Sequence, residues 1–298
     1  MAHVRGQPLR AMIGPVLKYG LLGLGAVVML APFADMFVGA LRTPAERLAQ
    51  PPAYWPHDPQ WGNYLRVFTE LPMGRWLFNS VVQTCAITAL QLLTSAMAGF
   101  ALAKYRFSGR ALLFRAILGA QMFPFFLFLI PVFFILRYFP LFGGNDILGQ
   151  GGTGFLNSYA AIILPFSVTW YGIFLMRQFF MALPDELLEA ARLDGASEFR
   201  IFGQIALPLV LPGLVTLGIF VFVYQWNEVI WTMTVTRTAP GLQTIPVGIY
   251  LLRGAFIDQG TRSLQEAALA VSIAPVIVTF LLLQRFYVRG LMAGAVKG

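Results

Sequence analysis

Residues 182–208 read ALPDELLEAARLDGASEFRIFGQIALP, a charged insert in an otherwise apolar chain. Five of the chain's thirteen acidic residues lie here, between Asp185 and Glu198. Pro184 suits the first turn of a helix, and Gly195 suits a left-handed stop after that helix. Ser197 can then cap a second helix. The insert therefore predicts two short helices joined at a glycine, and we call residues 184–208 the knuckle.

Long apolar segments lie on both sides of the knuckle. The chain is 58% hydrophobic and only 11% charged, whereas about a quarter of the residues of a soluble domain are charged. Apolar runs of about 18 residues or more indicate membrane helices. The runs are residues 19–41, 76–103, 116–136, 157–176, 207–234 and 267–284. The sequence therefore predicts an all-α membrane protein with six transmembrane helices.

The distribution of basic residues predicts the orientation in the membrane. Of the 21 Lys and Arg residues, eight fall on one side of the predicted membrane: Arg42, Arg47, Arg66, Arg75, Arg137, Arg237, Arg253 and Arg262. The others fall on the side of the knuckle and of both termini. Because cytoplasmic loops carry the excess of Lys and Arg, we expect the knuckle and both termini to be cytoplasmic. The basic residues form no single patch, so we expect no nucleic-acid binding.

Several features argue against chemistry within this chain. The only cysteine, Cys85, lies inside a span, and the two histidines, His3 and His57, are too scattered for a metal site. The Gly-rich stretch FGGNDILGQGGTGF, residues 142–155, lacks the ending of a phosphate-binding loop and is expected to be a flexible outer connector. We therefore expect no catalytic residues, no metal site and no nucleotide site.

Some local features of the spans can also be predicted. The first apolar run is longer than the core of a signal peptide and has no clean cleavage site, which favours an uncleaved anchor. The stretch WGNYLRVFTEL after this anchor predicts a short amphipathic helix, and Asp35 is expected to be a paired or interfacial acid. Kinks are expected at the prolines within the spans, Pro124, Pro131, Pro165 and Pro275.

Polar residues within spans are costly and are therefore candidates for a translocation path. Tyr224, Asn227 or Glu228, and Trp231 follow a spacing that would place them on one helix face. Gln121, with Trp170 and Tyr171, can join them. Aromatic faces beside hydrogen-bonding groups suit a sugar, so the candidate path is Gln121, Tyr224, Asn227, Glu228 and Trp231. Alternatively, Asn227 and Gln121 hold helices together, and Glu228 pairs with an arginine.

The knuckle resembles the coupling loop of the inner-membrane permease subunits of binding-protein-dependent ABC importers. The pattern of that loop is matched by Glu189-Ala190-Ala191, Gly195, Ile205, Leu207 and Pro208. Nearly the whole chain is similar to the carbohydrate-uptake branch and its maltose-type second permease. The segments that carry this likeness include NSVVQT, FALAKYRFSGR, QWNEVIW and RGLMAGAVKG.

The resemblance implies a type I importer permease fold of the MetI-like class, in a bacterial cytoplasmic (inner) membrane. It implies three segments: residues 1–75 with the tail, first anchor and first outer loop, 76–288 with the permease domain, and 289–298 as a cytoplasmic tail. The implied ATPase-coupling residues are Glu189, Ala190, Ala191, Asp194, Gly195, Ala196, Phe199, Ile205, Leu207 and Pro208. The implied C-terminal ATPase contacts are Gly294, Val296, Lys297 and Gly298.

The resemblance also implies the partners. These are a second, non-identical permease subunit, two ATP-binding cassette subunits that hold the ATP and Mg, an extracytoplasmic solute-binding protein and membrane lipid. The chain itself is expected to hold no cofactor. The expected function is ATP-driven import of an oligosaccharide or a related sugar or polyol by alternating access. An importer for a non-sugar solute, or a secondary transporter acting alone, stays open at this point.

Overall fold

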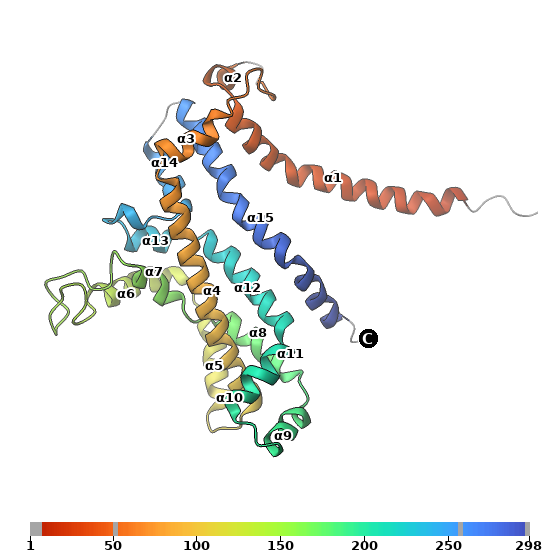
Figure 1. Cartoon of the computed structure of the whole chain (residues 1–298), viewed down its shortest axis with the longest axis vertical. Coiled ribbons are helices and arrows are strands. Elements are labelled where there is room, and N and C mark those ends of the chain that lie inside the picture. Colours follow the sequence, from red (N-terminus) through yellow and green to blue (C-terminus); the bar gives the residue numbers. More distant parts are fainter. Residues whose placement is uncertain (1–7, 50–52, 256–258, 296–298) are drawn as a thin grey trace, which may run out of the picture. The chain divides into compact units, whose positions relative to one another are not determined.

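The structure is a computed structural model, and it describes residues 8–49, 53–255 and 259–295 (Figure 1). Within these ranges every regular element is a helix. The elements are α1 (Pro8–Leu41), α2 (Pro44–Leu48), α3 (Gly62–Glu70), α4 (Met73–Lys104), α5 (Arg110–Ala120), α6 (Phe125–Arg137), α7 (Tyr159–Ile163), η1 (Leu164–Phe166), α8 (Trp170–Met181), α9 (Asp185–Leu193), α10 (Glu198–Arg200), η2 (Ile201–Ala206), α11 (Leu207–Leu209), α12 (Leu211–Trp226), α13 (Ile230–Val235), η3 (Pro240–Leu242), α14 (Ile245–Ala255) and α15 (Gln259–Ala295).

Among the described helices, three are long and apolar enough to cross a membrane: Leu17–Leu41 of α1, all of α4, and Arg262–Leu282 of α15. Three helix pairs pass the same test together but bend at a short break. The bend is 101° between α5 and α6, 46° between α7–η1 and α8, and 77° between Glu198–Leu209 and α12. The prediction of an all-α membrane protein is confirmed, with six spans when each bent pair is counted as one.

The third, fourth and fifth spans are each broken at a sharp bend, and the kinks predicted at Pro124 and Pro165 lie at two of these breaks. Pro124 follows the first break and Pro165 lies in η1 at the second, as expected from a residue that lacks an N–H and restricts its predecessor. The third break, at Val210, precedes Pro212. A further break, at Asn227–Val229, separates α12 from α13 and involves no proline. Pro131 and Pro275 lie inside α6 and α15, where a kink stays a prediction.

The chain divides into two compact units, which are described separately. Unit 1 comprises Met1–Pro72 and Leu252–Ile273. The amphipathic helix predicted after the first anchor is α3, and Arg42 pairs with Asp35 at 3.0 Å. Arg47 of α2 bonds to Glu266 and, at 2.9 Å, to the Ser263 hydroxyl. Unit 2 comprises Met73–Leu251 and Ala274–Gly298. The domain boundaries proposed from sequence, at residues 75/76 and 288/289, stay predictions.

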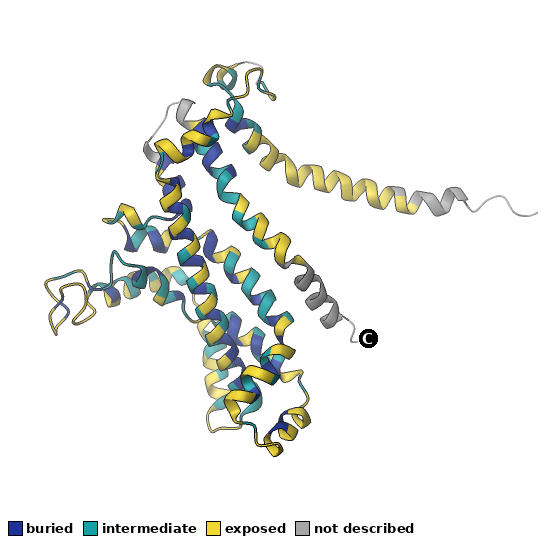
Figure 2. Cartoon of the chain, in the orientation of Figure 1, coloured by how far each residue is buried: buried dark blue, intermediate teal, exposed yellow. Residues whose placement is uncertain are grey.

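In unit 2, α4 packs along both α8 and α12, and all three helices contribute to the core (Figures 1 and 2). The backbones of α4 and α8 meet at Gly99, where a Cβ atom would lie 2.8 Å from the backbone nitrogen of Arg177. Small residues allow such close approach between membrane helices. Around the contact lie the buried side chains of Phe100, Met176 and Phe180.

The buried face of α4 carries polar side chains that bond to other segments of unit 2. The Gln91 amide donates to the Phe166 carbonyl at 2.6 Å, and the Asn79 amide donates to the Gly241 carbonyl at 2.9 Å. The Thr232 hydroxyl donates to the Gln83 side chain at 3.1 Å. Since an unpaired polar group in hydrocarbon is costly, these bonds fix α4 against its neighbours.

The Gly-rich stretch 142–155 is more ordered than the flexible connector expected from its sequence. Its anchor is the buried Asn145, whose amide donates to the carbonyls of Arg137 and Phe139 at 2.9 and 3.0 Å. The Gly152 N–H donates back to the Asn145 side chain at 2.9 Å. Asn145 and several backbone hydrogen bonds, such as that from the Thr153 N–H to the Gly143 carbonyl at 2.8 Å, together hold the stretch in place.

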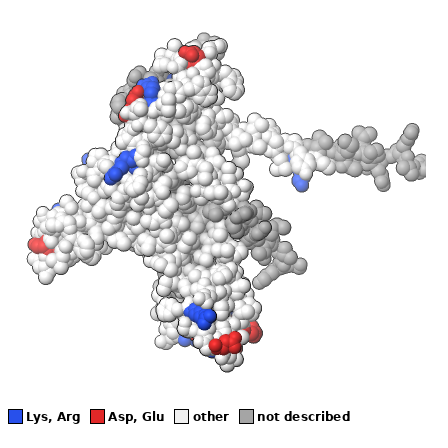
Figure 3. All heavy atoms as spheres, in the orientation of Figure 1, with Lys and Arg blue, Asp and Glu red and all other residues white. Residues whose placement is uncertain are grey.

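The surface of unit 2 matches a membrane setting. Large apolar side chains of α5 and α6 are exposed, among them Leu112, Phe126, Leu127 and Ile130. On the face shown in Figure 3, a broad middle region carries no charge, and acidic atoms gather at the end where Figure 1 labels α9. That acidic end is the knuckle.

Candidate functional site

The knuckle is a helix, a glycine turn and a second helix, as the sequence predicts. The turn follows α9 and has two backbone bonds of 3.0 Å, from the Gly195 N–H to the Arg192 carbonyl and from the Ala196 N–H to the Ala191 carbonyl. This is the Schellman arrangement, and it requires a left-handed residue after the helix. Gly195 is that residue, with φ of +80°.

The second arm of the knuckle departs from the prediction. Ser197 accepts a hydrogen bond from the Arg200 N–H at 3.4 Å and so caps α10, as expected. The chain then enters a π-helical turn, η2, which changes the angular spacing of the side chains. Phe199, Phe202 and Ala206, whose spacing would place them on one apolar edge of a regular helix, do not form such an edge, because Ala206 is buried whereas Phe199 is 84% exposed.

The inner face of the knuckle packs on the core of unit 2. Leu188, Ala191 and Ile201 are buried in the same hydrophobic cluster as Phe100 of α4. The Phe202 ring packs on the Phe100 ring at a tilt of 50°, with a centroid distance of 5.3 Å. Burial of each large apolar side chain stabilises such contacts by about 1.5–3 kcal/mol. The knuckle is thus seated on the end of α4 rather than hanging from a loop.

Polar bonds hold the first arm of the knuckle to α4. The Lys104 ammonium, on a side chain only 5% exposed, donates to the Leu183 carbonyl at 2.6 Å and to the Asp185 carboxylate at 2.5 Å. This bond lowers the pKa of Asp185 below its ordinary value. Asp185 therefore stays ionised, and the bond weakens only in acid, as the pH falls below the ordinary range of an aspartate.

The second arm is held by Glu198. The Tyr105 hydroxyl donates to this carboxylate at 2.6 Å, and the Arg192 guanidinium donates to both of its oxygens at 2.7 and 3.2 Å. Burial, and then the bond to Glu198, raise the pKa of Tyr105 to about 12. The hydroxyl therefore remains a donor at any physiological pH. Glu198 ties together the end of α4, α9 and α10.

Tyr105→Phe should loosen this brace without unfolding the protein. Loss of one hydrogen bond to a charged group costs about 1.5–3 kcal/mol, so amides of residues 186–200 should exchange with solvent at least about tenfold faster. Hydrogen-exchange mass spectrometry measures this directly. Tyr138→Phe is the matched control, since its hydroxyl makes no hydrogen bond within the described residues. Equal exchange in both variants would show that Tyr105 does not brace the knuckle.

The outer face of the knuckle presents two uncovered apolar side chains among acids. Leu193 is 90% exposed and Phe199 is 84% exposed, on either side of the Gly195 turn. Glu189, Ala190 and Asp194 are also exposed. Ile205 and Leu207 are half-buried and Pro208 is exposed, at the junction with α11. A partner that covers this face needs an apolar socket and a basic rim.

A second candidate site is a cavity of about 560 Å³ in unit 2. Four of the residues that the sequence analysis proposed for a sugar path line it: Gln121, Trp170, Tyr171 and Tyr224. Gln91 and Gln225 line it as well. Gln225 is only 3% exposed, and its side-chain oxygen has no hydrogen-bond partner within the described residues. Gln225 thus holds a buried acceptor without a partner in the wall of the cavity.

The remaining proposed path residues do not line this cavity. The prediction that Tyr224, Asn227 or Glu228, and Trp231 share one helix face is wrong, because α12 ends at Trp226. Trp231 is buried and donates to the Ala161 carbonyl at 2.9 Å. Glu228 accepts from the N–H groups of Trp231 and Thr232 at 2.6 and 3.0 Å and so caps α13 instead of pairing with an arginine. The Asn227 side-chain amide donates to the Val223 carbonyl, four residues earlier in the chain, at 2.7 Å.

Most of the residues proposed for the C-terminal ATPase contact lie outside the part of the chain that the structure describes. Gly294 belongs to α15. Val296, Lys297 and Gly298 lie outside the described residues. Their contact with an ATPase stays a prediction.

The sequence of this chain matches the model of a known protein family. Residues 93–295 match the model of the family described as binding-protein-dependent transport system inner membrane component. The chain belongs to this family. The match covers the whole knuckle and every proposed path residue.

Similar proteins support the same family. The chain is 33% identical to the sulfoquinovosyl glycerol transport system permease protein SmoH of Agrobacterium fabrum, over 98% of this chain and 95% of that protein. It is 31% identical to the arabinooligosaccharides transport system permease protein AraQ of Halalkalibacterium halodurans, over 97% and 100%. Among solved structures, a bacterial ABC transporter involved in the import of alginate has a similar chain fold, with a TM-score of 0.77 at 24% identity, over 96% of this chain and 100% of that one.

Family membership places the protein among the multi-pass permease subunits of the bacterial inner membrane. Subunits of this family are not enzymes, and a separate ATPase hydrolyses ATP. The permease thus needs surfaces that connect it to other proteins.

Sequence reasoning missed several residues that build these sites. Lys104 and Tyr105, which brace the knuckle, stand in FALAKYRFSGR at the end of the second span. Leu193 directly precedes the Asp194-Gly195 turn, and nothing in the sequence marks it as exposed. Gln91 and Gln225 are glutamines within apolar spans, and the argument that singled out Gln121 applies to them equally.

Proposed function

We propose that this permease subunit translocates an oligosaccharide, or a related sugar or polyol, by alternating access driven by an ATPase bound at the knuckle. The observation that carries this proposal is the contrast between the two faces of the knuckle. The inner face is bonded and packed to α4, while Leu193 and Phe199 on the outer face are uncovered. A partner that grips the outer face can therefore move the membrane helices.

The route of this movement follows from the packing of unit 2. A force on Leu193 or Phe199 passes through α9 to the Lys104 and Glu198 bonds at the end of α4. The same helix packs along α8 and α12, which line the cavity. Because packed helices shift as units rather than compress, the movement can open or close the cavity.

The cavity supports a sugar or polyol as the substrate. Among the described residues that line it, the polar groups are amides and hydroxyls, next to the aromatic rings of Phe166, Trp170 and Tyr171. Rings can cover the weakly apolar faces of a sugar, and amides can bond to its hydroxyls. The names of the relatives SmoH and AraQ also refer to sugar-containing solutes.

The proposed assembly contains a second, non-identical permease subunit and two ATP-binding cassette subunits that bind the ATP and Mg, with no cofactor in this chain. An extracytoplasmic binding protein delivers the solute, in keeping with the description of the family as binding-protein-dependent. The knuckle and both termini face the cytoplasm, and the C-terminal residues Gly294, Val296, Lys297 and Gly298 add a second ATPase contact.

Reconstitution tests this proposal against its alternatives. In proteoliposomes that hold all the proposed subunits, uptake of a labelled oligosaccharide should require both ATP and the binding protein. Uptake driven by an ion gradient without the ATPase would instead indicate a secondary transporter. Binding of a phosphate, peptide or amino acid, but of no sugar, by the cognate binding protein would indicate an importer for another solute.

Gln225→Leu should weaken sugar transport without destabilising the fold. The side-chain oxygen of Gln225 has no hydrogen-bond partner among the described residues, so an apolar residue of similar shape fits there, while a bond to the substrate worth about 0.5–1.5 kcal/mol is lost. The apparent KM for uptake should rise up to about tenfold. Gln178→Leu, at an exposed position of α8 outside the cavity, is the control, and an equal effect of both changes would remove the cavity from the path.

A further inference from the structure

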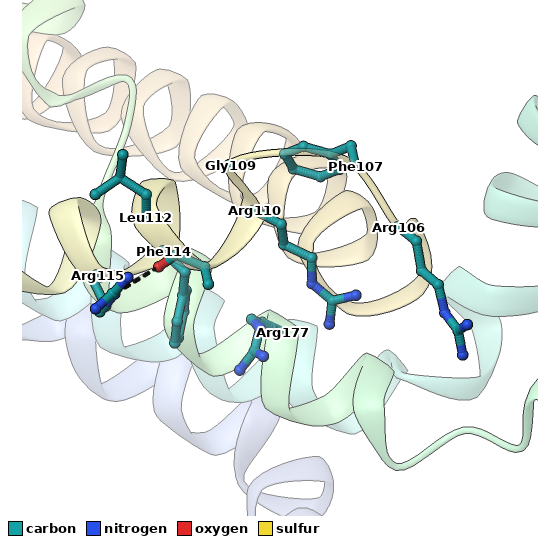
Figure 4. A pocket seen from close by; sticks show the side chains of 9 residues that line it. Arg106, Phe107, Gly109, Arg110, Leu112, Phe114, Arg115 and Arg177 are labelled. Atoms are coloured by element: carbon teal, nitrogen blue, oxygen red, sulfur yellow. Dashed lines mark hydrogen bonds between the residues drawn. The ribbon is translucent and has the colours of Figure 1, made fainter.

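A basic pocket lies beside the knuckle brace, at the junction of the 105–109 segment, α5 and α8. Its volume is about 740 Å³. Four arginines line it, Arg106, Arg110, Arg115 and Arg177, together with apolar side chains of α5 and of the segment before it. In Figure 4, the Arg110 side chain extends from the start of α5 toward Arg177 of α8. The Arg106 side chain extends from the preceding loop in a similar direction.

The arginine charges of this pocket are not balanced by acids. Within the described residues, none of the four guanidinium groups forms an ion pair. Arg110, Arg115 and Arg177 donate to the backbone carbonyls of Tyr105, Ala111 and Leu102, at 3.0, 3.3 and 3.3 Å. These bonds orient the side chains but leave their charges uncompensated, and Arg110 and Arg177 repel each other. Asp185, an acid near Arg106, is bonded to Lys104.

The start of α5 adds to the positive potential. This eleven-residue helix begins at Arg110, after Gly109 with φ of +82°, and no side chain caps it. Gly109, Arg110 and Ala111 all line the pocket. The N-terminal N–H groups of a helix and its dipole favour an anion, so helix and arginines attract the same kind of ligand.

Apolar side chains lie next to these charges. Phe107 and Leu112 line the pocket and are exposed, and the Arg177 guanidinium lies 4.1 Å from the centre of the Phe114 ring. The pocket stands at the end of the membrane-spanning α4, on the side that the Lys and Arg distribution assigns to the cytoplasm. A ligand that fits both parts has a phosphate group joined to an apolar tail.

We propose that this pocket binds the phosphate headgroup of an anionic phospholipid from the cytoplasmic leaflet. Arginine suits this role because its planar fork bonds two phosphate oxygens at once and keeps its charge. Basic pockets between membrane helices on the cytoplasmic side are suited to anionic lipid headgroups. A free phosphate ion would use the arginines but not Phe107 and Leu112. The bound lipid lies one residue from Tyr105, beside the brace of the knuckle.

Photolabelling tests this site independently of transport. The full chain, purified from membranes with the subunits that accompany it, is titrated with a photoactivatable phosphatidylglycerol, and labelled peptides are mapped. Label is expected on residues 106–115. In Arg106→Gln/Arg177→Gln the half-saturating probe concentration should rise about 30-fold, the equivalent of two basic contacts to an anionic lipid. Arg106→Lys/Arg177→Lys, which keeps the charges, should lose less, and Arg237→Gln should lose nothing.

Three results would overturn the proposal. The first is equal labelling of residues 106–115 by a photoactivatable phosphatidylcholine, which would show that the headgroup charge is not recognised. The second is full competition by millimolar inorganic phosphate, which would show a soluble anion as the ligand. The third is labelling that the glutamine variant leaves unchanged while another protein subunit cross-links to the same residues, which would identify the pocket as a protein contact.

Discussion

ATP-driven uptake should fall at least about tenfold in Gly195→Val, while the permease still inserts and accumulates in the membrane. Gly195 has φ of +80°, a conformation that costs an ordinary residue about 1–2 kcal/mol and a β-branched residue more. Valine would therefore open the turn that sets α9 against α10. Leu193 and Phe199 would move apart, so a partner shaped for both could no longer hold them.

The surroundings of Gly195 make this prediction specific. No atom lies within 4 Å of the position that a Cβ would take there, so a substitution acts through the backbone and not through a clash. Gly195→Asn is the matched control, since asparagine tolerates the left-handed conformation, and it should keep most of the uptake. Uptake by the two variants is measured in membrane vesicles, and the amount of permease in the membrane is checked by immunoblot. Full uptake by the valine variant would mean that the turn geometry does not matter for coupling.

The largest effect on assembly is expected from Leu193→Ala/Phe199→Ala. Burial of each of these side chains in a partner contributes about 1.5–3 kcal/mol, so loss of both should weaken ATPase binding at least about 100-fold. The fold should not suffer, because both side chains are exposed and exposed positions are usually neutral to substitution. The dissociation constant of the ATPase from permease in nanodiscs measures the effect.

Two further variants separate docking from folding. Leu148→Ala removes another exposed leucine, 77% exposed, from the Gly-rich stretch and should leave ATPase binding unchanged. Leu188→Ala removes the buried inner contact and should lower the stability of the knuckle itself. If the double variant bound the ATPase as tightly as the Leu148→Ala control, the outer face would not be the docking surface.

The parts of the knuckle that depend on local chemistry could be predicted from sequence. Gly195 ends α9 and Ser197 caps α10 because a left-handed turn and a capping hydroxyl are properties of single residues. The π-helical turn of η2 could not be predicted, since it arises where Ile201 and Ala206 both enter the core.

For the cavity too, some residues could be predicted from the sequence and others could not. Gln121 and Tyr224 could be predicted as cavity residues because a polar residue within an apolar span is recognisable from composition alone. Trp231 was misplaced because the face argument assumed an unbroken helix, whereas Glu228 caps a new helix two residues further on. Hydrogen bonds between distant segments, such as Tyr105 to Glu198, leave no spacing pattern in the sequence. The same holds for the arginine pocket, whose members come from two helices and the loop before one of them.

The most direct test of the docking proposal is a cross-link from the outer face of the knuckle in intact cells. Cys85 is the only cysteine, so a Cys85→Ser background allows a single cysteine at Leu193 or Phe199. Both sites should capture the ATPase subunit, and a cysteine at the exposed Leu148 should not. Capture of no ATPase from either knuckle site, with the protein assembled and transporting, would contradict the account.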